Sequence, residues 1–113
     1  MTLDLNGAMV RLGNDVALFE EFIGFYEEDY PRLLKELEQG VENRDGDAVH
    51  HAAHGLKGLV ASLGATDVAG AAGSLERMGR TKDFSEADEV LSKLAAEIEK
   101  LNSELAAFRR KKK

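Results

Sequence analysis

Residues 49–63, VHHAAHGLKGLVASL, carry the clearest helical pattern in the chain. At about 100° per residue, the apolar side chains of this stretch fall on one side of a helix and His54 falls on the other. The apolar set is Val49, Ala52, Ala53, Leu56, Leu59, Val60 and Leu63. Lys57, Gly58 and Ala61 lie within about 60° of His54 on the same projection. A helix that buries its apolar face therefore presents this imidazole to water beside one lysine and two small residues, which predicts a docking site for another macromolecule.

The rest of the chain is also predicted to be helical, because no strand-like alternation of apolar and polar residues persists beyond a few positions. A short helix is expected over 5–12, with Asp4 able to cap it and Gly13 ending it. A second helix starts after Asp15. At Pro31 it either kinks or gives way to a new helix, since proline lacks an N–H and clashes with the preceding turn.

Turn residues place the remaining boundaries. The third long helix is expected over 48–63, capped by Asp45 or Asp47 and closed by Gly64. The fourth follows a cap at Thr66 or Asp67. It carries a narrow stripe that suits close packing, formed by Val68, Ala72, Leu75 and Gly79.

The last helix is expected over 86–109, after a loop at 82–84 and a Ser85/Asp88 pair that resembles a capping box. Four long apolar stripes joined by short connections favour antiparallel neighbours. We therefore expect residues 1–113 to form one all-α domain, an up-and-down antiparallel four-helix bundle with a short extra N-terminal helix. Four stripes are enough to close a bundle within one chain, so a monomer is expected.

Charge and composition exclude several classes of protein. Residues 109–113 hold five of the 15 Lys and Arg residues, so 1–108 carries ten cations against 21 acids, a net charge of −11. An acidic body argues against nucleic acid as the main partner, and the basic tail is explained by a solvated helix end. The chain has no cysteine, no apolar run long enough for a membrane span and no basic leader, so a cytoplasmic protein is expected.

The residues around His54 suit phosphoryl chemistry. A neutral imidazole is a nucleophile near neutral pH, and the Lys57 ammonium can stabilise the oxygens of an arriving phosphoryl group. Gly58 costs about 1 kcal/mol relative to alanine in a helix interior, a cost explained if a second protein approaches the backbone there. Gly55 carries the same cost, but packing against a neighbouring helix explains it equally well.

Several strings resemble the histidine-containing phosphotransfer (HPt) domains of multistep two-component signalling. They are HGLKG at 54–58, LGA at 63–65, LE at 75–76, RLGND at 11–15 and LLKEL at 33–37. The resemblance implies that His54 accepts a phosphoryl group from a receiver-domain aspartate or a kinase and passes it to a response-regulator aspartate. It also implies that Lys57 stabilises the phosphate and that Gly58 leaves room for the receiver. On the helical projection Ala61 and His51 lie on the same side, so they are expected at the same docking surface.

The same resemblance implies which parts the partner supplies. The expected partners are response-regulator receiver domains and a hybrid or sensor histidine kinase, and the receiver would bring the aspartate and the Mg²⁺. No GxxxxGK[ST] loop is present, so the chain is expected to be a phosphoryl carrier without its own ATP site or cofactor rather than an enzyme.

Glu76 is a further candidate from geometry. If the chain reverses at about Gly64 and Ala65, then His54 and Glu76 lie at similar height on adjacent antiparallel helices, each eleven positions from Ala65. Glu76 would then accept a hydrogen bond from one ring nitrogen and leave the other free to attack. The alternative is an ordinary surface acid.

Three competing functions are weighed against phosphotransfer. His50 and His54, with His51 or Asp47 nearby, have the spacing of metal ligands, but the cation of Lys57 would oppose a metal ion. A helical adapter that binds receiver or kinase domains without being phosphorylated would not explain why His54 and Lys57 are both present. A hydrolase would need a serine or cysteine nucleophile close to His54, and none is apparent.

Overall fold

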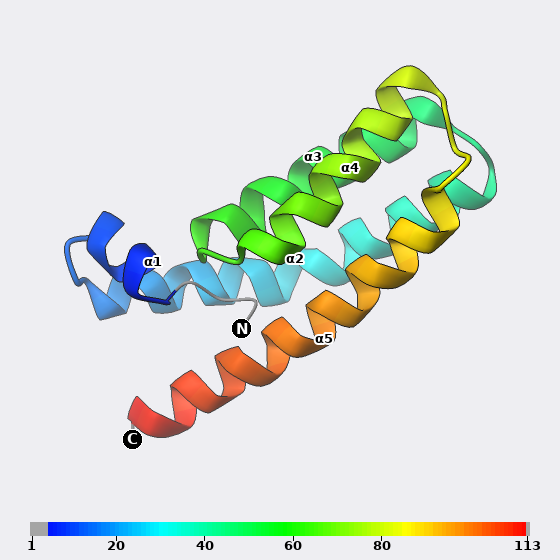
Figure 1. Ribbon diagram of the computed structural model, residues 1–113. Coiled ribbons are helices and arrows are strands. Elements are labelled where there is room, and N and C mark those ends of the chain that lie inside the picture. Colours follow the sequence, from blue (N-terminus) through cyan, green and yellow to red (C-terminus); the bar gives the residue numbers. More distant parts are fainter. Residues whose placement is uncertain (1–4, 113) are drawn as a thin grey trace.

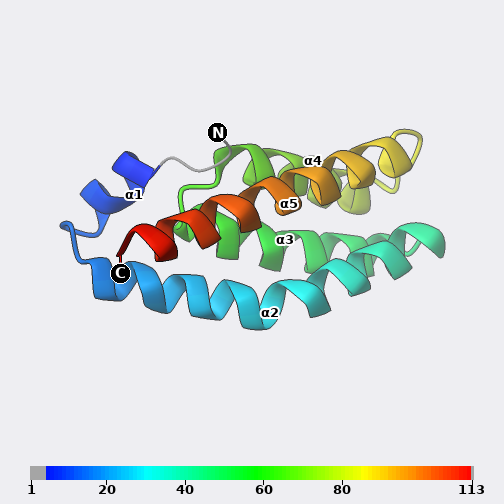
Figure 2. The ribbon, with the colours of Figure 1, turned by 90° about the horizontal axis from the view of Figure 1, so that it is seen from below.

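The computed structural model describes residues 5–112, and within them the chain forms five α-helices and no strand (Figure 1). The helices are α1 Leu5–Arg11, α2 Val16–Glu42, α3 Gly46–Ser62, α4 Thr66–Thr81 and α5 Ala87–Lys112. Helices α2 to α5 run alternately in opposite directions around a shared core, and α1 lies at one end of α2 (Figures 1 and 2). The predicted all-α bundle with a short N-terminal helix is confirmed.

Helix α2 continues through Pro31 as one element, so the alternative in which a new helix begins there is wrong. Figure 2 shows the helix bent near the middle of its length. The helix continues because its apolar stripe packs on the same core before and after the proline, as the burial of Ile23, Tyr26, Leu33 and Leu37 shows. The side of α2 that carries Pro31 is exposed to solvent, where a missing backbone hydrogen bond is tolerated.

Aspartate side chains cap both α2 and α3, and the second is one of the two caps predicted for that helix. Asp15 caps α2, since its Oδ1 accepts a hydrogen bond of 3.0 Å from the amide of Leu18. Asp45 caps α3 and accepts from the amide of Ala48 at 3.2 Å, so Asp45 is the cap and Asp47 lies in the first turn. Helix α1 ends at Arg11, and Asp4 lies outside the described residues.

The predicted cap of α4 is wrong. Neither Thr66 nor Asp67 caps the helix: Ala65 holds the cap position, with no side-chain hydrogen bond. Gly64 takes a positive φ of 76° and reverses the chain directly after α3. The turn is so short that Ala65 is drawn into the core, where it is fully buried, and apolar burial takes the place of a polar cap.

The predicted capping box before α5 is also wrong. The Ser85 hydroxyl donates to Asp83 Oδ1 at 2.8 Å, and Asp88 lies 3.8 Å from a guanidinium nitrogen of Arg44. Helix α5 begins at Ala87, which is buried. At its other end the helix includes Arg109, which pairs with Glu27 of α2 at 2.8 Å, so the basic tail continues α5 up to the last described residue.

Helices α3 and α4 approach each other so closely that their backbones touch. A Cβ added at Gly79 of α4 would lie 2.6 Å from the amide nitrogen of His50 and 2.7 Å from the carbonyl oxygen of Gly46, both on α3. Real Cβ atoms do not come so close to backbone atoms, so only glycine fits at position 79. The narrow stripe predicted for α4 therefore packs as expected and holds the two helices at a short distance.

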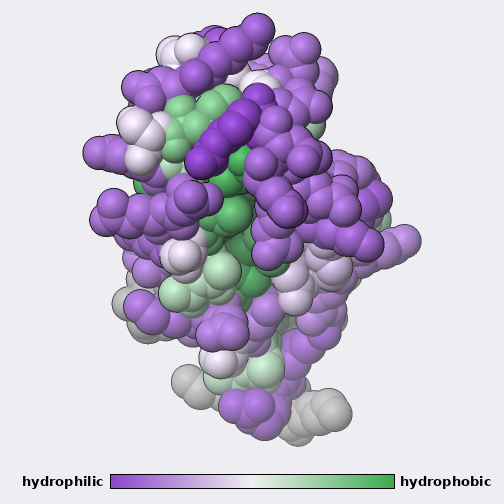
Figure 3. Space-filling view, turned by 90° about the vertical axis from the view of Figure 1, so that its right-hand side faces the viewer, coloured by the Kyte–Doolittle hydropathy of each residue, from purple (hydrophilic) through white to green (hydrophobic). Residues whose placement is uncertain are grey.

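Seen from the end of the bundle that carries the α4–α5 connection, most of the visible surface is hydrophilic, and apolar side chains gather in a band between hydrophilic ones (Figure 3). None of the helices in the described part of the chain is long and apolar enough to cross a membrane.

Candidate functional site

Helix α3 presents His54 to solvent, on the side that the projection predicts. The His54 side chain is 67% exposed, whereas Ala53 and Leu56 on the opposite side are fully buried. A Cβ added at Gly58 would meet no atom within 4 Å. His51 and Ala61 are exposed on the same helix. The four residues predicted to meet a partner are therefore all accessible.

Glu76 reaches His54 from the neighbouring helix α4. Its Oε2 lies 2.7 Å from His54 Nδ1, and its Oε1 accepts a hydrogen bond of 2.5 Å from Lys57 Nζ. The Glu76 side chain is only 12% exposed. The stem of Lys57 lies over Gly73, where an added Cβ would come 3.7 Å from Lys57 Cδ. Glu76 is thus a nearly buried carboxylate shared by a histidine and a lysine.

The ionisation of Glu76 determines which ring nitrogen of His54 carries the proton. The hydrogen bond from Lys57 holds the pKa of the Glu76 carboxyl below its ordinary value, and the bond with His54 acts in the same direction, while burial opposes both. An ionised carboxylate can only accept hydrogen bonds, so His54 Nδ1 must be the donor. In the neutral imidazole, Nε2 then keeps its lone pair and is free to react.

Lys57 lies where the helical spacing predicts, next to His54, but its ammonium contacts Glu76. The side chain is 40% exposed. The sequence predicts that Lys57 stabilises an incoming phosphoryl group. It does not predict that the ammonium also pairs with a carboxylate on α4. The ion pair keeps the ammonium beside His54 while no phosphate is present.

The sequence offers His50 only as a candidate metal ligand together with His54, and the structure places its ring beside Glu76. Its Nε2 lies 3.8 Å from the same Glu76 oxygen that bonds His54. The His50 and His54 rings are nearly parallel, 9° apart, with centroids separated by 6.3 Å. The spacing of four residues places His50 and His54 on the same side of a helix. Only the structure shows that both rings lie next to Glu76.

The two glycines beside His54 have different surroundings. Gly55 faces α2, where an added Cβ would lie 3.3 Å from Leu33 Cδ2. Of the two explanations left open for Gly55, packing against a neighbouring helix is the one that the structure supports. Gly58 faces open space, so packing within the chain does not account for it.

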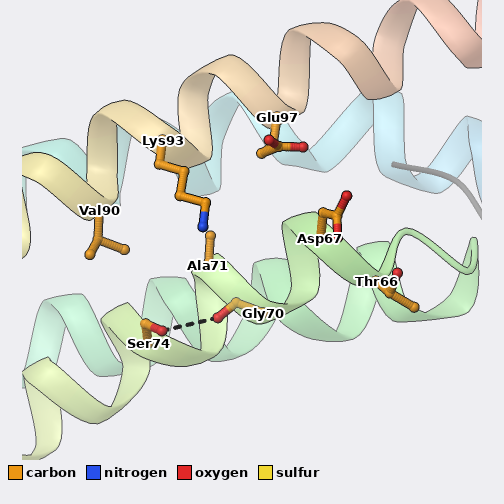
Figure 4. A pocket seen from close by; sticks show the side chains of 8 residues that line it. All are labelled: Thr66, Asp67, Gly70, Ala71, Ser74, Val90, Lys93 and Glu97. Carbon is orange, nitrogen blue, oxygen red and sulfur yellow. Dashed lines mark hydrogen bonds between the residues drawn. The ribbon is translucent and has the colours of Figure 1, made fainter. Parts of the chain in front are cut away.

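The site lies on α3 and α4 and shares no residue with the cavity between α4 and α5. That cavity has a volume of about 440 Å³ and is lined by Thr66, Asp67, Gly70, Ala71, Ser74, Val90, Lys93 and Glu97. Lys93 reaches across it from α5 toward Ala71 (Figure 4). Among the described residues, no group of three or more His, Cys, Asp or Glu side chains is placed to hold a metal ion.

Two comparisons with known proteins found matches. The crystal structure of histidine-containing phosphotransfer protein B (HptB) from Pseudomonas aeruginosa PAO1 superposes with a TM-score of 0.86, over 96% of this chain and 95% of that one, at 20% sequence identity. This likeness shows a shared fold. No curated protein matches the chain at a significant level. The Hpt domain family matches residues 21–107, more than half of the sequence. The chain therefore belongs to the Hpt domain family, whose members carry phosphoryl groups in phosphorelays and interact with receiver domains and kinases.

Proposed function

We propose that His54 is the phosphoryl-accepting residue of this chain. It receives the group from a receiver-domain aspartyl phosphate or from a kinase and passes it to the aspartate of a response-regulator receiver. The observation that carries this proposal is the 2.7 Å contact between Nδ1 of the exposed His54 and the ionised Glu76. Because this contact holds the proton on Nδ1, the other ring nitrogen, Nε2, keeps its lone pair and is the nucleophile.

In the transfer step, the Nε2 lone pair attacks the phosphorus atom. A bond forms between nitrogen and phosphorus, and the bond from phosphorus to the donor carboxylate oxygen breaks, so the aspartate leaves as a carboxylate. No proton has to move. The proton on Nδ1 stays hydrogen-bonded to Glu76, which stabilises the positive charge that the ring gains when Nε2 is phosphorylated.

Lys57 is proposed to stabilise the phosphoryl oxygens during this step. Its side chain is long, partly exposed and anchored beside His54 through Glu76. An arriving phosphoryl group brings negative charge toward the same ammonium, and Lys57 can turn to it without leaving the site. Glu76 then interacts with both residues: it orients the His54 ring, and it keeps the Lys57 ammonium beside His54 until the phosphoryl group arrives.

The exposed face of α3 is proposed to dock the receiver. Gly58 leaves the backbone open, and Ala61 and His51 continue the accessible surface. The receiver would supply the aspartate and the Mg²⁺, and this chain would add no cofactor of its own. We propose a cytoplasmic monomer that forms a single domain. The adapter alternative is not favoured, because the chain is an Hpt domain with a histidine arranged for attack.

The test is transfer from a receiver domain that carries labelled aspartyl phosphate. We expect label on the wild-type protein that is lost in acid and stable in alkali, as a phosphohistidine is, and no label on His54→Gln. The matched control is His51→Gln, which removes an exposed histidine from the proposed docking surface and can slow transfer, but leaves the phosphoryl-accepting nitrogen of His54 in place and should still become labelled. Label that persists on His54→Gln would contradict the assignment.

A further inference from the structure

A second histidine shares the carboxylate that orients His54. His50, His54 and Lys57 follow one another on the side of α3 that faces α4, and all three point to Glu76. His54 and Lys57 each hold one oxygen of Glu76, at 2.7 and 2.5 Å. His50 Nε2 lies 3.8 Å from the oxygen held by His54, with 37% of its side chain exposed.

The position of His50 is determined by backbone packing. The amide nitrogen of His50 is the atom that an added Cβ at Gly79 would approach to 2.6 Å. Gly79 lies one turn beyond Glu76 on α4, so the closest contact between the two helices is next to the shared carboxylate. The backbone of His50 therefore cannot move away from Glu76 without separating α3 from α4.

The charge on His50 determines whether it interacts with Glu76. A separation of 3.8 Å is too long for a hydrogen bond, so neutral His50 leaves the oxygen to His54. Protonated His50 is a cation within ion-pair reach of that oxygen. Three other charged or titratable residues lie nearby in the chain or across the contact: Asp47 precedes His50 by three positions on α3, the His51 ring centroid lies 5.8 Å from that of His50, and Arg80 follows Gly79 on α4. All three are exposed, where water and salt screen their charges.

We propose that His50 is a positioning residue for phosphotransfer: when protonated, it shares Glu76 with His54 and disfavours a second proton on His54. The inference rests on the proposed role of His54. Glu76 carries one negative charge and already holds the ammonium of Lys57, so it cannot balance two imidazolium rings whose centroids are 6.3 Å apart. A proton on His50 thus keeps His54 Nε2 in its nucleophilic form to lower pH.

The first test measures how the rate of His54 phosphorylation by phosphoramidate depends on pH. Each variant is compared with its own rate at about pH 8.5, well above the range in which histidines titrate. We expect the acid limb of His50→Asn to move to higher pH by about half a unit, which lowers its relative rate near pH 6 by about threefold. His50→Lys, which keeps a cation at this position, should return the limb to the wild-type position or below it.

The matched control is His51→Asn, which removes a neighbouring histidine that has no contact with Glu76 among the described ion pairs. Its acid limb should move less than that of His50→Asn. Superimposable profiles for wild type and His50→Asn, or an equal shift in His51→Asn, would overturn the proposal. Circular dichroism confirms that each variant is folded.

The second test needs no phosphorylation. The ring-proton resonances of His54 should titrate at higher pH in His50→Asn than in the wild type, and those of His50 should also move to higher pH in His54→Gln, because the coupling is reciprocal. Absence of both shifts would refute the role of His50 whatever the transfer assay shows. If the resonances are coupled but the wild type takes no label at any pH, the proposed function fails and the coupling stands.

Discussion

Helices α3 and α4 meet backbone to backbone, whereas α2 and α5 are bridged by large side chains. At the first contact, Gly46 and Gly79 leave no room for a Cβ. At the second, the Tyr26 hydroxyl donates to Asn102 Oδ1 at 2.9 Å, and Phe19 packs edge-on against Phe108 with ring centroids 5.2 Å apart. Bulky side chains can adjust to small shifts, but two touching backbones cannot.

The difference between these two contacts matches the location of the proposed site. The short bonds from Glu76 to His54 and Lys57 join side chains of α4 and α3, so the two helices must be held at one distance. No residue of the proposed site lies on α5, and that helix closes the core from the other side. The pair of helices whose backbones touch therefore carries the proposed site, and the pair bridged by large side chains does not.

The largest effect is expected from Gly79→Ala. The added Cβ would overlap the amide nitrogen of His50 and the carbonyl oxygen of Gly46, so the helices must separate at a cost of about 3 kcal/mol in the free energy of unfolding. Urea denaturation measures this cost. Gly70→Ala on the same helix is the matched control: it meets no atom within 4 Å and should be neutral or stabilising by up to about 1 kcal/mol. Equal effects of the two substitutions would show that α3 and α4 do not touch.

The next largest effect is expected on the rate of phosphoryl transfer, in the variant Glu76→Gln. The amide keeps the shape of Glu76 but loses the charge that orients His54 Nδ1–H and holds Lys57, so transfer from a receiver should slow by about tenfold or more. At neutral pH the stability should stay within about 1 kcal/mol of the wild type. An unchanged transfer rate would show that Glu76 does not take part in phosphotransfer.

The same variant tests the acid side of the stability profile. The pKa of Glu76 is lowered in the folded protein, so its contribution to stability is present above the unfolded value of 4.5 and is lost as pH falls through the folded value. The wild type should therefore lose more stability below about pH 4.5 than Glu76→Gln does. Parallel acid profiles would contradict this.

A smaller effect is expected on the other side of the bundle, from Tyr26→Phe. The loss of the hydroxyl leaves Asn102 Oδ1 without its donor and should cost about 1 kcal/mol, with transfer unchanged because α5 does not contribute to the site. Burial raises the pKa of the Tyr26 hydroxyl, so the wild type should also lose stability as pH rises above about 10, and the variant should lose less. A slower transfer in Tyr26→Phe would show that the two sides of the bundle are coupled.

Much of the fold and the outward face of α3 could be predicted because they depend on local spacing. The periodicity of α3 placed His54 on the solvent side and Leu56 in the core, and both lie there. The predictions that were wrong depend on neighbours distant in sequence. Thr66 and Asp67 are good cap residues, but burial of Ala65 in the core moved the start of α4. Pro31 allowed either a kink or a new helix, and the second alternative is wrong because core contacts on both sides carry α2 through the proline.

The sequence by itself determined that this chain is a helical bundle with an exposed histidine beside a lysine and an open glycine, because helical periodicity is set by neighbours three and four residues apart. Only the tertiary structure decided which atoms meet at Glu76. The contact of Lys57 with a carboxylate on α4, and the approach of His50 to the oxygen that holds His54, depend on the distance between two helices. That distance is set where Gly79 touches the backbone of α3, a contact between residues that no local pattern connects.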